Sequence, residues 1–178
     1  MDISHIDYVL PEELIAQTPL EPRDSARLLV DSTGGLQHRH VSDIVEYLRA
    51  GDVLVVNHTR VLPARLKLKR RTGGAVEVLL LEERDAGQMQ WEALVRPGGK
   101  LLLGEELLDD SGAVMLRIGE RTQAGDTFFV QFVARSHEEA MQKIMDTGEM
   151  PLPPYITTAL VDQSRYQTVF AHDQKSSA

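Results

Sequence analysis

Residues 62–71 read Leu-Pro-Ala-Arg-Leu-Lys-Leu-Lys-Arg-Arg, and this stretch decides the fold of the 178-residue chain. Its apolar residues recur at every second position, at Leu62, Ala64, Leu66 and Leu68. Successive side chains of a β-strand point to opposite faces, so the pattern predicts a strand with one apolar face and one basic face.

Further strand-like segments follow this one, and glycines lie in the turns between them. They span residues 76–81, 91–95, 113–118 and 127–133. Several short strands at this spacing favour a small antiparallel barrel or sandwich. We therefore expect an all-β region that runs from Leu62 to Val133.

The segment before this region predicts a mixture of helices and strands. Helices are expected over residues 11–17, after Pro11, and from Ser42 to Leu48. Residues 27–30 are typical of a strand, and the wholly apolar run at 53–56 predicts a strand covered on both faces.

The segment after the strands opens with Ser136 and Glu139, which have the spacing of a helix capping box, and Gly148 ends the predicted helix. The predicted fold class is α+β, a mixed α/β domain with an inserted antiparallel β-barrel domain. Residues 1–60 are expected to form the first part of the mixed domain and 61–149 the inserted barrel. Residues 150–178 then return to the mixed domain.

The composition excludes several classes of protein. There is no cysteine, which excludes disulfides, thiolate nucleophiles and cysteine-based metal sites. No apolar run approaches the ~18 residues of a membrane span, and the first residues lack the pattern of a signal peptide, so we expect a cytoplasmic protein. The formal net charge of −8 argues against nucleic-acid binding over the whole surface, although a local patch can differ.

The stretch from residue 57 to residue 71 is such a patch, because it contains cations and no acid. Clustered cations attract phosphates and gain affinity by releasing counterions. The alternative is a solvated face of a barrel strand, on which lysines block edge pairing. The candidate phosphate contacts are Arg60, Arg65, Lys67, Lys69, Arg70 and Arg71.

Two further groups of polar residues can be interpreted either as ligand-binding groups or as purely structural ones. Asn57, Thr59 and Arg60 follow the apolar run, where ligands of open α/β sheets gather, but Asn-x-Thr also forms turns that satisfy their own backbone. Arg23 and Arg27 flank Asp24 either as a phosphate or carboxylate clamp or as a surface ion pair.

The segment Met150–Pro154 reads Met-Pro-Leu-Pro-Pro and is stiff, because proline fixes φ and restricts the residue before it. It would hold Tyr155 in a defined place, where an aromatic ring can stack on a base or close a pocket; the alternative is a rigid linker. Tyr166 is a second aromatic candidate. His38 and His40 lack further metal ligands nearby, so we interpret them as surface histidines and expect no metal site.

Five stretches together resemble one family. They are LPEELIAQTPLEPRDSARLLV (Leu10 to Val30), GDVLVVNHTRVLPARL (Gly51 to Leu66), TGGAVEVLLL (Thr72 to Leu81), GEMPLPPYI (Gly148 to Ile156) and RYQTVFA (Arg165 to Ala171). In this order they resemble the N-terminal half of the S-adenosylmethionine:tRNA ribosyltransferase-isomerases of queuosine biosynthesis. The chain departs from the family pattern at Ala26, His58 and Leu68.

The resemblance implies a reaction and its substrates. The family transfers the ribosyl part of S-adenosylmethionine to a 7-aminomethyl-7-deazaguanine in tRNA and isomerises it to epoxyqueuosine, releasing adenine and methionine. S-adenosylmethionine is then a consumed substrate and no cofactor is expected. The implied partner is tRNA with a GUN-type anticodon, and we expect a monomer that binds no membrane.

The resemblance also frames the candidate site. Substrate contacts are expected from Asn57, Thr59, Arg60, Arg65, Tyr155, Tyr166 and Arg27, whereas the catalytic base is not identified. Members of the family are considerably longer, which predicts that this chain is an incomplete part and that it is inactive alone. The alternatives are a non-catalytic RNA-binding barrel module and a protein-interaction domain in which the proline segment is the ligand or the hinge.

Overall fold

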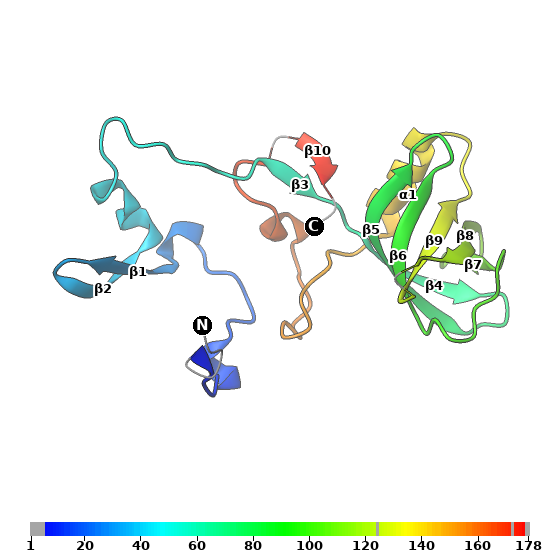
Figure 1. Ribbon diagram of the computed structural model, residues 1–178, viewed down its shortest axis with the longest axis horizontal. Coiled ribbons are helices and arrows are strands. Elements are labelled where there is room, and N and C mark those ends of the chain that lie inside the picture. The colour runs from blue at the N-terminus through cyan, green and yellow to red at the C-terminus, as the bar shows by residue number, and fades with distance from the viewer. Residues whose placement is uncertain (1–5, 124, 172, 177–178) are drawn as a thin grey trace. The chain divides into compact units, whose positions relative to one another are not determined.

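The computed structural model describes residues 6–123, 125–171 and 173–176, the last of these by their backbone alone. The chain divides into two units (Figure 1). The N-terminal unit comprises Met1–Val56 with Pro153–Arg165, and the barrel unit comprises Asn57–Leu152 with Tyr166–Ala178. The domain boundaries expected from the sequence, after residues 60 and 149, stay predictions.

Six strands of the barrel unit close into an antiparallel barrel in the order β4-β5-β6-β9-β8-β7 (Figure 1). This confirms the predicted fold class, with its inserted antiparallel barrel. The strands are β4 (Arg65–Arg70), β5 (Ala75–Asp85), β6 (Gln90–Arg96), β7 (Glu106–Leu108), β8 (Val114–Arg121) and β9 (Thr127–Phe132).

The period-two pattern of residues 62–71 explains how the barrel is filled. Along β4 the side chains of Leu66 and Leu68 are buried while those of Lys67 and Lys69 are exposed. The opposite strand repeats the alternation, since Val76, Val78 and Leu80 of β5 are buried. Because one face of each strand is apolar, closing the sheet removes that face from water, and this burial stabilises the barrel.

Helix α1 (His137–Thr147) packs its apolar face on the barrel through the buried side chains of Ala140 and Ile144. Its start is capped as expected, because the Ser136 hydroxyl accepts a hydrogen bond of 3.2 Å from the amide of Glu139. Gly148 ends it. A Cβ at this position would lie 1.8 Å from the carbonyl oxygen of Pro63, so only glycine fits against the strand.

A second, smaller sheet of the barrel unit pairs β3 (Thr59–Val61) in parallel with β10 (Asp173–Ser176). The short 3₁₀ helix η5 (Gln163–Tyr166) precedes Gln167, whose side chain is 8% exposed. The segment that leaves the barrel after α1 therefore returns to the strand that leads into it.

The N-terminal unit contains a two-stranded antiparallel sheet and short 3₁₀ helices. None of its described residues is buried. Its elements are η2 (Glu12–Leu14), η3 (Arg23–Ser25), β1 (Arg27–Ser32), β2 (Gly35–His40) and η4 (Val41–Glu46).

Two helices predicted in this unit are wrong in type and extent. Residues 11–17 contain only the turn η2, and the segment from Ser42 contains the 3₁₀ helix η4. Short helices depend on tertiary packing of an apolar face. The apolar face of η4 lacks such packing, since Ile44 and Val45 are 37% and 70% exposed.

The strand predicted at residues 53–56 is also wrong. The segment forms no strand, and Val53 and Val55 are 87% and 89% exposed. An apolar run becomes a buried strand only when neighbouring strands and covering layers are present, and no described residue supplies them here.

No helix in the described parts of the chain combines the length and the apolar character that a membrane crossing would need.

Candidate functional site

The site begins where the chain enters the barrel unit. The side-chain oxygen of Asn57 accepts hydrogen bonds from the amide of Thr59, at 3.0 Å, and from its hydroxyl, at 2.6 Å. This is the turn that satisfies its own backbone, which was one of the two interpretations of Asn-x-Thr. The amide nitrogen of Asn57 is still available to a ligand as a donor.

Arg60 follows this turn on β3 and is exposed. Its neighbours Thr59 and Val61 are partly buried, so the strand turns the guanidinium outward. Arg60 forms no ion pair or hydrogen bond with another described residue. It is therefore a cation whose five donors are free to bind an anion.

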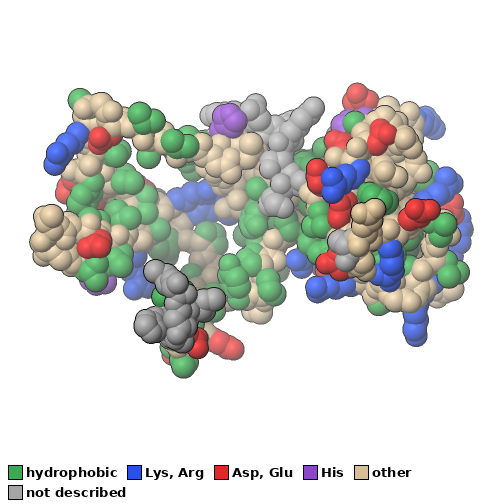
Figure 2. Space-filling model, viewed as in Figure 1, with side chains coloured by type: hydrophobic (Ala, Val, Ile, Leu, Met, Phe, Trp, Pro, Cys, Tyr) green, Lys and Arg blue, Asp and Glu red, His purple; other side chains and the backbone are tan. Residues whose placement is uncertain are grey.

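The other cations of the stretch are each matched by a carboxylate. Figure 2 shows Lys and Arg side chains beside Asp and Glu side chains over the barrel unit. Exposed ion pairs contribute little stability, but each carboxylate offsets the field of its partner at the surface. The pairs are Lys67–Glu149, Lys69–Asp110, Arg70–Glu105 and Arg71–Glu106.

The guanidiniums lower the pKa of the carboxyl groups that they contact in these pairs. Hydrogen bonds from Arg70 lower the pKa of Glu105 below its ordinary value. Those from Arg71 and Arg117 do the same for the pKa of Glu106. Both acids therefore stay ionised at neutral pH, and the cations keep their partners.

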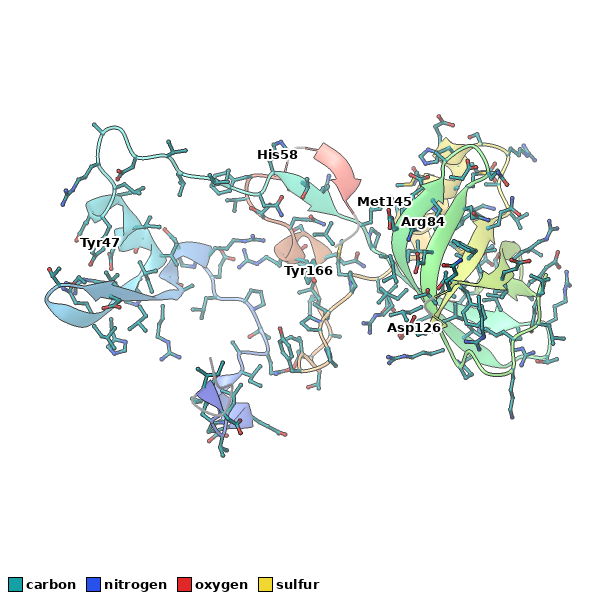
Figure 3. The ribbon with its side chains drawn as sticks, viewed as in Figure 1. Tyr47, His58, Arg84, Asp126, Met145 and Tyr166 are labelled. Atoms are coloured by element: carbon teal, nitrogen blue, oxygen red, sulfur yellow. The ribbon has the colours of Figure 1, made fainter. Side chains whose placement is uncertain are left out.

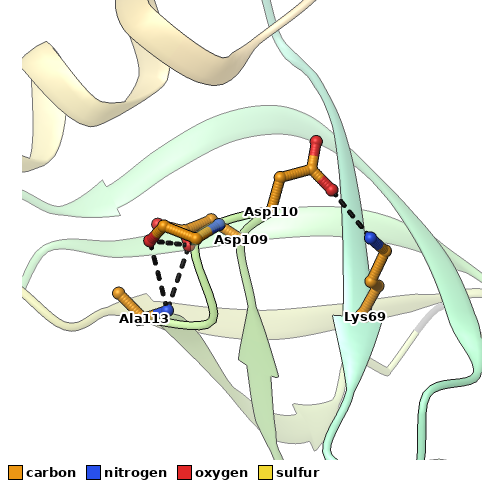
Figure 4. A network of polar contacts seen from close by, with 5 residues as sticks. Lys69, Asp109, Asp110 and Ala113 are labelled. Atoms are coloured by element: carbon orange, nitrogen blue, oxygen red, sulfur yellow. Dashed lines mark hydrogen bonds and ion pairs between the residues drawn. The ribbon is translucent and has the colours of Figure 1, made fainter.

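The pair between Lys69 and Asp110 shows how the sequence arranges such a contact (Figure 4). The ammonium of Lys69 lies 2.9 Å from the Asp110 carboxylate. Asp110 is held there by a turn in which the Asp109 carboxylate accepts from the hydroxyl of Ser111 and the amide of Ala113. These bonds lower the pKa of Asp109, with the Ser111 hydroxyl as the largest cause.

Arg65 carries a positive charge and also links two segments of the barrel unit. Its guanidinium donates a 3.1 Å hydrogen bond to the carbonyl oxygen of Leu152, in the proline segment, and lies 3.9 Å from the Glu77 carboxylate. Its Nε atom is buried and has no partner among the described residues. Arg65 thus joins strand β4 to the start of the proline segment.

Tyr166 and Gln167 complete the same region of the barrel unit, and Figure 3 labels Tyr166 on the segment that passes beside β3. The Tyr166 hydroxyl donates a 3.2 Å hydrogen bond to the carbonyl oxygen of Pro151. The Gln167 side chain accepts from the amide of Val61 and donates to its carbonyl oxygen, each at 2.8 Å.

Sequence reasoning missed Gln167. The signal was a polar residue between Tyr166 and the apolar pair Val169 and Phe170, but single glutamines are common on surfaces. Only the fold brings this amide to the backbone of Val61.

Two predicted site residues lie in the N-terminal unit instead. Tyr155 is 59% exposed, and its carbonyl oxygen accepts a 2.9 Å hydrogen bond from Gln17. Arg27 begins β1, is exposed, and forms no ion pair with another described residue. The structure brings Arg60, Arg65 and Tyr166 into one unit, whereas a role for Arg27 and Tyr155 beside them stays a prediction.

Arg23, beside Asp24, contacts the other stretch of its unit, and the choice between a clamp and a surface ion pair at Asp24 stays open. The guanidinium of Arg23 donates to the carbonyl oxygens of Ser164 and Arg165, at 3.2 and 2.9 Å. Arg23 thereby ties the two stretches of the N-terminal unit together.

His38 and His40 both lie on β2. Within the described ranges no group of three or more His, Asp or Glu side chains is arranged to hold a metal ion.

The described carboxyl groups with a shifted pKa do not have the signature of a general base. Such a base usually has a pKa moved toward neutrality by burial or by a like charge. Every carboxyl group whose pKa is shifted here is shifted downward, as for Glu92 beside Arg84 and for Asp162 beside Ser164. The arrangement can bind anions and polar ligands, and it assigns no proton-transfer step.

The chain is similar to known proteins along almost its whole length. The model of a family described as queuosine biosynthesis protein matches residues 3–178. S-adenosylmethionine:tRNA ribosyltransferase-isomerases from Staphylococcus aureus strains JH9 and Newman are each 45% identical over 184 aligned residues. The alignment covers 100% of this chain and 52% of each relative, so the chain spans about half the length of these curated relatives.

A solved structure is also similar. The crystal structure of S-adenosylmethionine tRNA ribosyltransferase from Thermotoga maritima shares 40% sequence identity. The match covers 80% of this chain and 47% of that chain, with a TM-score of 0.39.

Proposed function

Because the chain belongs to the queuosine biosynthesis protein family, we propose that it forms the barrel-containing part of an S-adenosylmethionine:tRNA ribosyltransferase-isomerase. The 45% identity along the full chain to relatives of that name is the observation that carries this proposal. The reaction would transfer the ribosyl part of S-adenosylmethionine to 7-aminomethyl-7-deazaguanine in tRNA and form epoxyqueuosine, with release of adenine and methionine.

The chemistry divides into tasks that this chain can and cannot supply. The positive sulfonium makes the C5′ protons of S-adenosylmethionine acidic, so a base removes one of them before adenine and methionine leave. No described residue is assigned this step. This chain would supply binding and orientation, which lower the barrier by fixing the reactants in place.

Arg60 is our first choice for an anion contact in the substrate complex. It is exposed and has no ion-pair partner among the described residues, and its fork matches a carboxylate or a phosphate. Asn57 and Thr59 lie beside it and would bind a polar edge through the free amide of Asn57. Tyr155 and Tyr166 remain candidates for stacking, and Arg27 for a further contact.

The cations of β4 would contribute less to tRNA binding than their number suggests. Lys67, Lys69, Arg70 and Arg71 can reach a phosphate only by giving up a carboxylate. Arg65 would likewise have to give up its hydrogen bond to the carbonyl oxygen of Leu152. We therefore propose that Arg60 dominates among the six predicted phosphate contacts.

A chimeric protein tests the proposed activity. This chain would replace the matching half of the Staphylococcus aureus relative, and the product would be incubated with S-adenosylmethionine and a GUN-type tRNA carrying the precursor base. We expect adenine release that requires the precursor base, and none with tRNA that lacks it. A chimera that folds cooperatively yet releases no adenine contradicts the proposal.

The same experiment separates the enzyme from a non-catalytic RNA-binding module. The 178-residue chain alone would be tested for tRNA binding and for S-adenosylmethionine binding. Binding of tRNA by the chain, with an inactive but folded chimera, favours the module. A cytoplasmic location and a monomeric state stay predictions, checked by fractionation and by light scattering.

A further inference from the structure

The cations of the barrel unit fall into two groups when they are sorted by their partners. Most are paired with acids, as shown above for β4 and also for Arg84 with Glu92 and Arg117 with Glu106. Arg96 and Lys100 are different, because both are exposed and neither forms an ion pair with a described residue. They stand at the two ends of one short loop, which leads from β6 toward β7.

Two acids beside this loop are already committed to other groups. Glu77 is the cross-strand neighbour of Arg96, but its carboxylate lies 3.9 Å from Arg65. Glu105 accepts from Arg70 and from the amide of Leu102. Neither of these carboxylates forms an ion pair with Arg96 or Lys100.

The backbone of the loop is also open to a ligand. The amides of Gly98, Gly99 and Lys100 donate no hydrogen bond to another described residue. A Cβ at Gly99 would meet nothing within 4 Å, so the peptide groups there are accessible from outside. Amides that lack a partner in the protein bind water or an anion.

The loop is nevertheless held in place by the barrel. Gly98 packs so closely on Phe128 that a Cβ would lie 3.1 Å from its ring. Arg121 donates a 3.0 Å hydrogen bond to the carbonyl oxygen of Gly98 and lies 4.3 Å from the centre of the Phe128 ring. Asp126, labelled in Figure 3, lies in the neighbouring turn and forms no ion pair with Arg121. A fixed loop loses little conformational entropy when it binds.

We propose that this loop, Arg96–Lys100, is a phosphate-contacting surface of the barrel that binds the backbone of tRNA. The inference rests on the proposed function for the identity of the RNA. Unpaired side-chain cations at both ends and free amides between them are the groups that take up phosphate oxygens. The site differs from the β4 stretch, where each cation already has a protein partner.

Salt-dependent binding of an unmodified GUN-type tRNA transcript tests this surface. The chain would be compared with the double variant Arg96→Ala/Lys100→Ala between about 50 and 200 mM salt. Two lost phosphate contacts should weaken binding about tenfold at the lower salt concentration and reduce the slope of log K against log salt by about two.

A matched control removes two positive charges that already have carboxylate partners. The double variant Arg84→Ala/Arg117→Ala changes the net charge by the same amount, on the same barrel. We expect its slope to equal that of the unchanged chain. Equal urea midpoints for all three proteins establish that the loop variant folds.

Two outcomes overturn the proposal. An unchanged slope in the loop variant shows that the loop does not contact phosphate, and would direct attention to a protein partner at this surface. Equal losses in both double variants show that only the total charge matters. If the loop variant loses tRNA binding as expected but the chimera releases no adenine, the proposed enzyme activity fails while the loop inference stands.

Discussion

At the scale of the residue, the side-chain amide of Gln167 makes the two backbone hydrogen bonds that a neighbouring strand would make. It pairs with both the amide and the carbonyl oxygen of Val61, and only 8% of the residue is exposed. Buried polar groups that lose their partners cost more than the hydrogen bond itself was worth. The stability of β3 therefore depends on a side chain far along the sequence.

Replacing Gln167 by alanine should lower the free energy of unfolding by about 1 to 2 kcal/mol, because two partly buried backbone groups of Val61 lose their partner. Urea denaturation followed by circular dichroism measures this. Gln163→Ala, in the exposed helix η5, is the control and should stay within about 0.5 kcal/mol. Equal stability of the two variants would show that water replaces the amide.

The ion pair of Glu105 with Arg70 predicts how stability depends on pH. The pKa of Glu105 is lowered in the folded chain, so the pair stabilises the fold above the ordinary glutamate value of about 4.3. That stability is lost as the pH falls through the lower folded pKa.

Urea unfolding from pH 7 to pH 3 checks this sign. The variant Glu105→Gln should be less stable at pH 7 and should lose less stability on acidification than the unchanged chain. Glu13→Gln, an exposed residue of η2, should keep the original profile. A steeper acid loss in Glu105→Gln would contradict the assignment.

Sequence reasoning identified Arg60 and the alternating cations, but not their partners. Lys69 meets Asp110 because β4 and β7 close the barrel, and Lys67 meets Glu149 because the chain after α1 bridges to Arg65. A single sequence shows which charges a strand carries, and the fold alone shows which of them are neutralised.

At the scale of the element, two apolar segments that were both predicted to be strands had different outcomes. The alternating leucines of β4 became the barrel core, whereas the continuous run at residues 53–56 stayed exposed. Period two predicts a half-buried strand directly, because alternate side chains of a strand lie on opposite faces and only one of these faces is apolar. A continuous run requires two covering layers, which the sequence pattern does not supply by itself.

One substitution made in both elements measures the difference. Leu66→Ala removes a side chain with 0% exposure and should cost about 2 to 5 kcal/mol of unfolding free energy. Leu54→Ala removes one that is 60% exposed and should cost less than about 0.5 kcal/mol. A large loss at Leu54 would show that the run is buried in solution.

At the scale of the whole molecule, the apolar core is unevenly distributed. Every buried apolar residue lies between Leu62 and Ile144, in the barrel unit, and the described residues of the N-terminal unit are all partly or fully exposed. Regions with few buried contacts open at low free-energy cost. The barrel should therefore be the stable part of this chain.

Limited trypsin digestion followed by mass spectrometry tests this. Cleavage should occur first after Arg27 and Arg49, in the N-terminal unit, and later after Lys67 and Lys69 of β4. Urea at a concentration that unfolds the barrel is the control, since the order of cleavage should then disappear. Equal protection of both units in buffer would mean that the N-terminal unit has a core of its own.

The sequence was sufficient for the barrel and insufficient for the N-terminal unit for one physical reason. The alternating pattern of a barrel strand marks its buried face whichever strand it pairs with, so local pattern and final packing agree. The expected helices at 11–17 and from Ser42 needed packing partners that their own segments do not contain.

The pairing of Arg65 with Glu149 has a consequence for how the barrel can be handled. The amide of each residue donates to the carbonyl oxygen of the other, at 3.1 and 2.8 Å, so the chain enters and leaves the barrel at one place. The two points at which the flanking chain joins the barrel are therefore as close together as the ends of a tight turn. The length of the insertion between them adds little to the entropic cost of bringing these ends together, because that cost grows slowly with loop length. Evolution or an engineer could exchange this barrel for a few linker residues, or for another barrel, without stretching the segments that carry it.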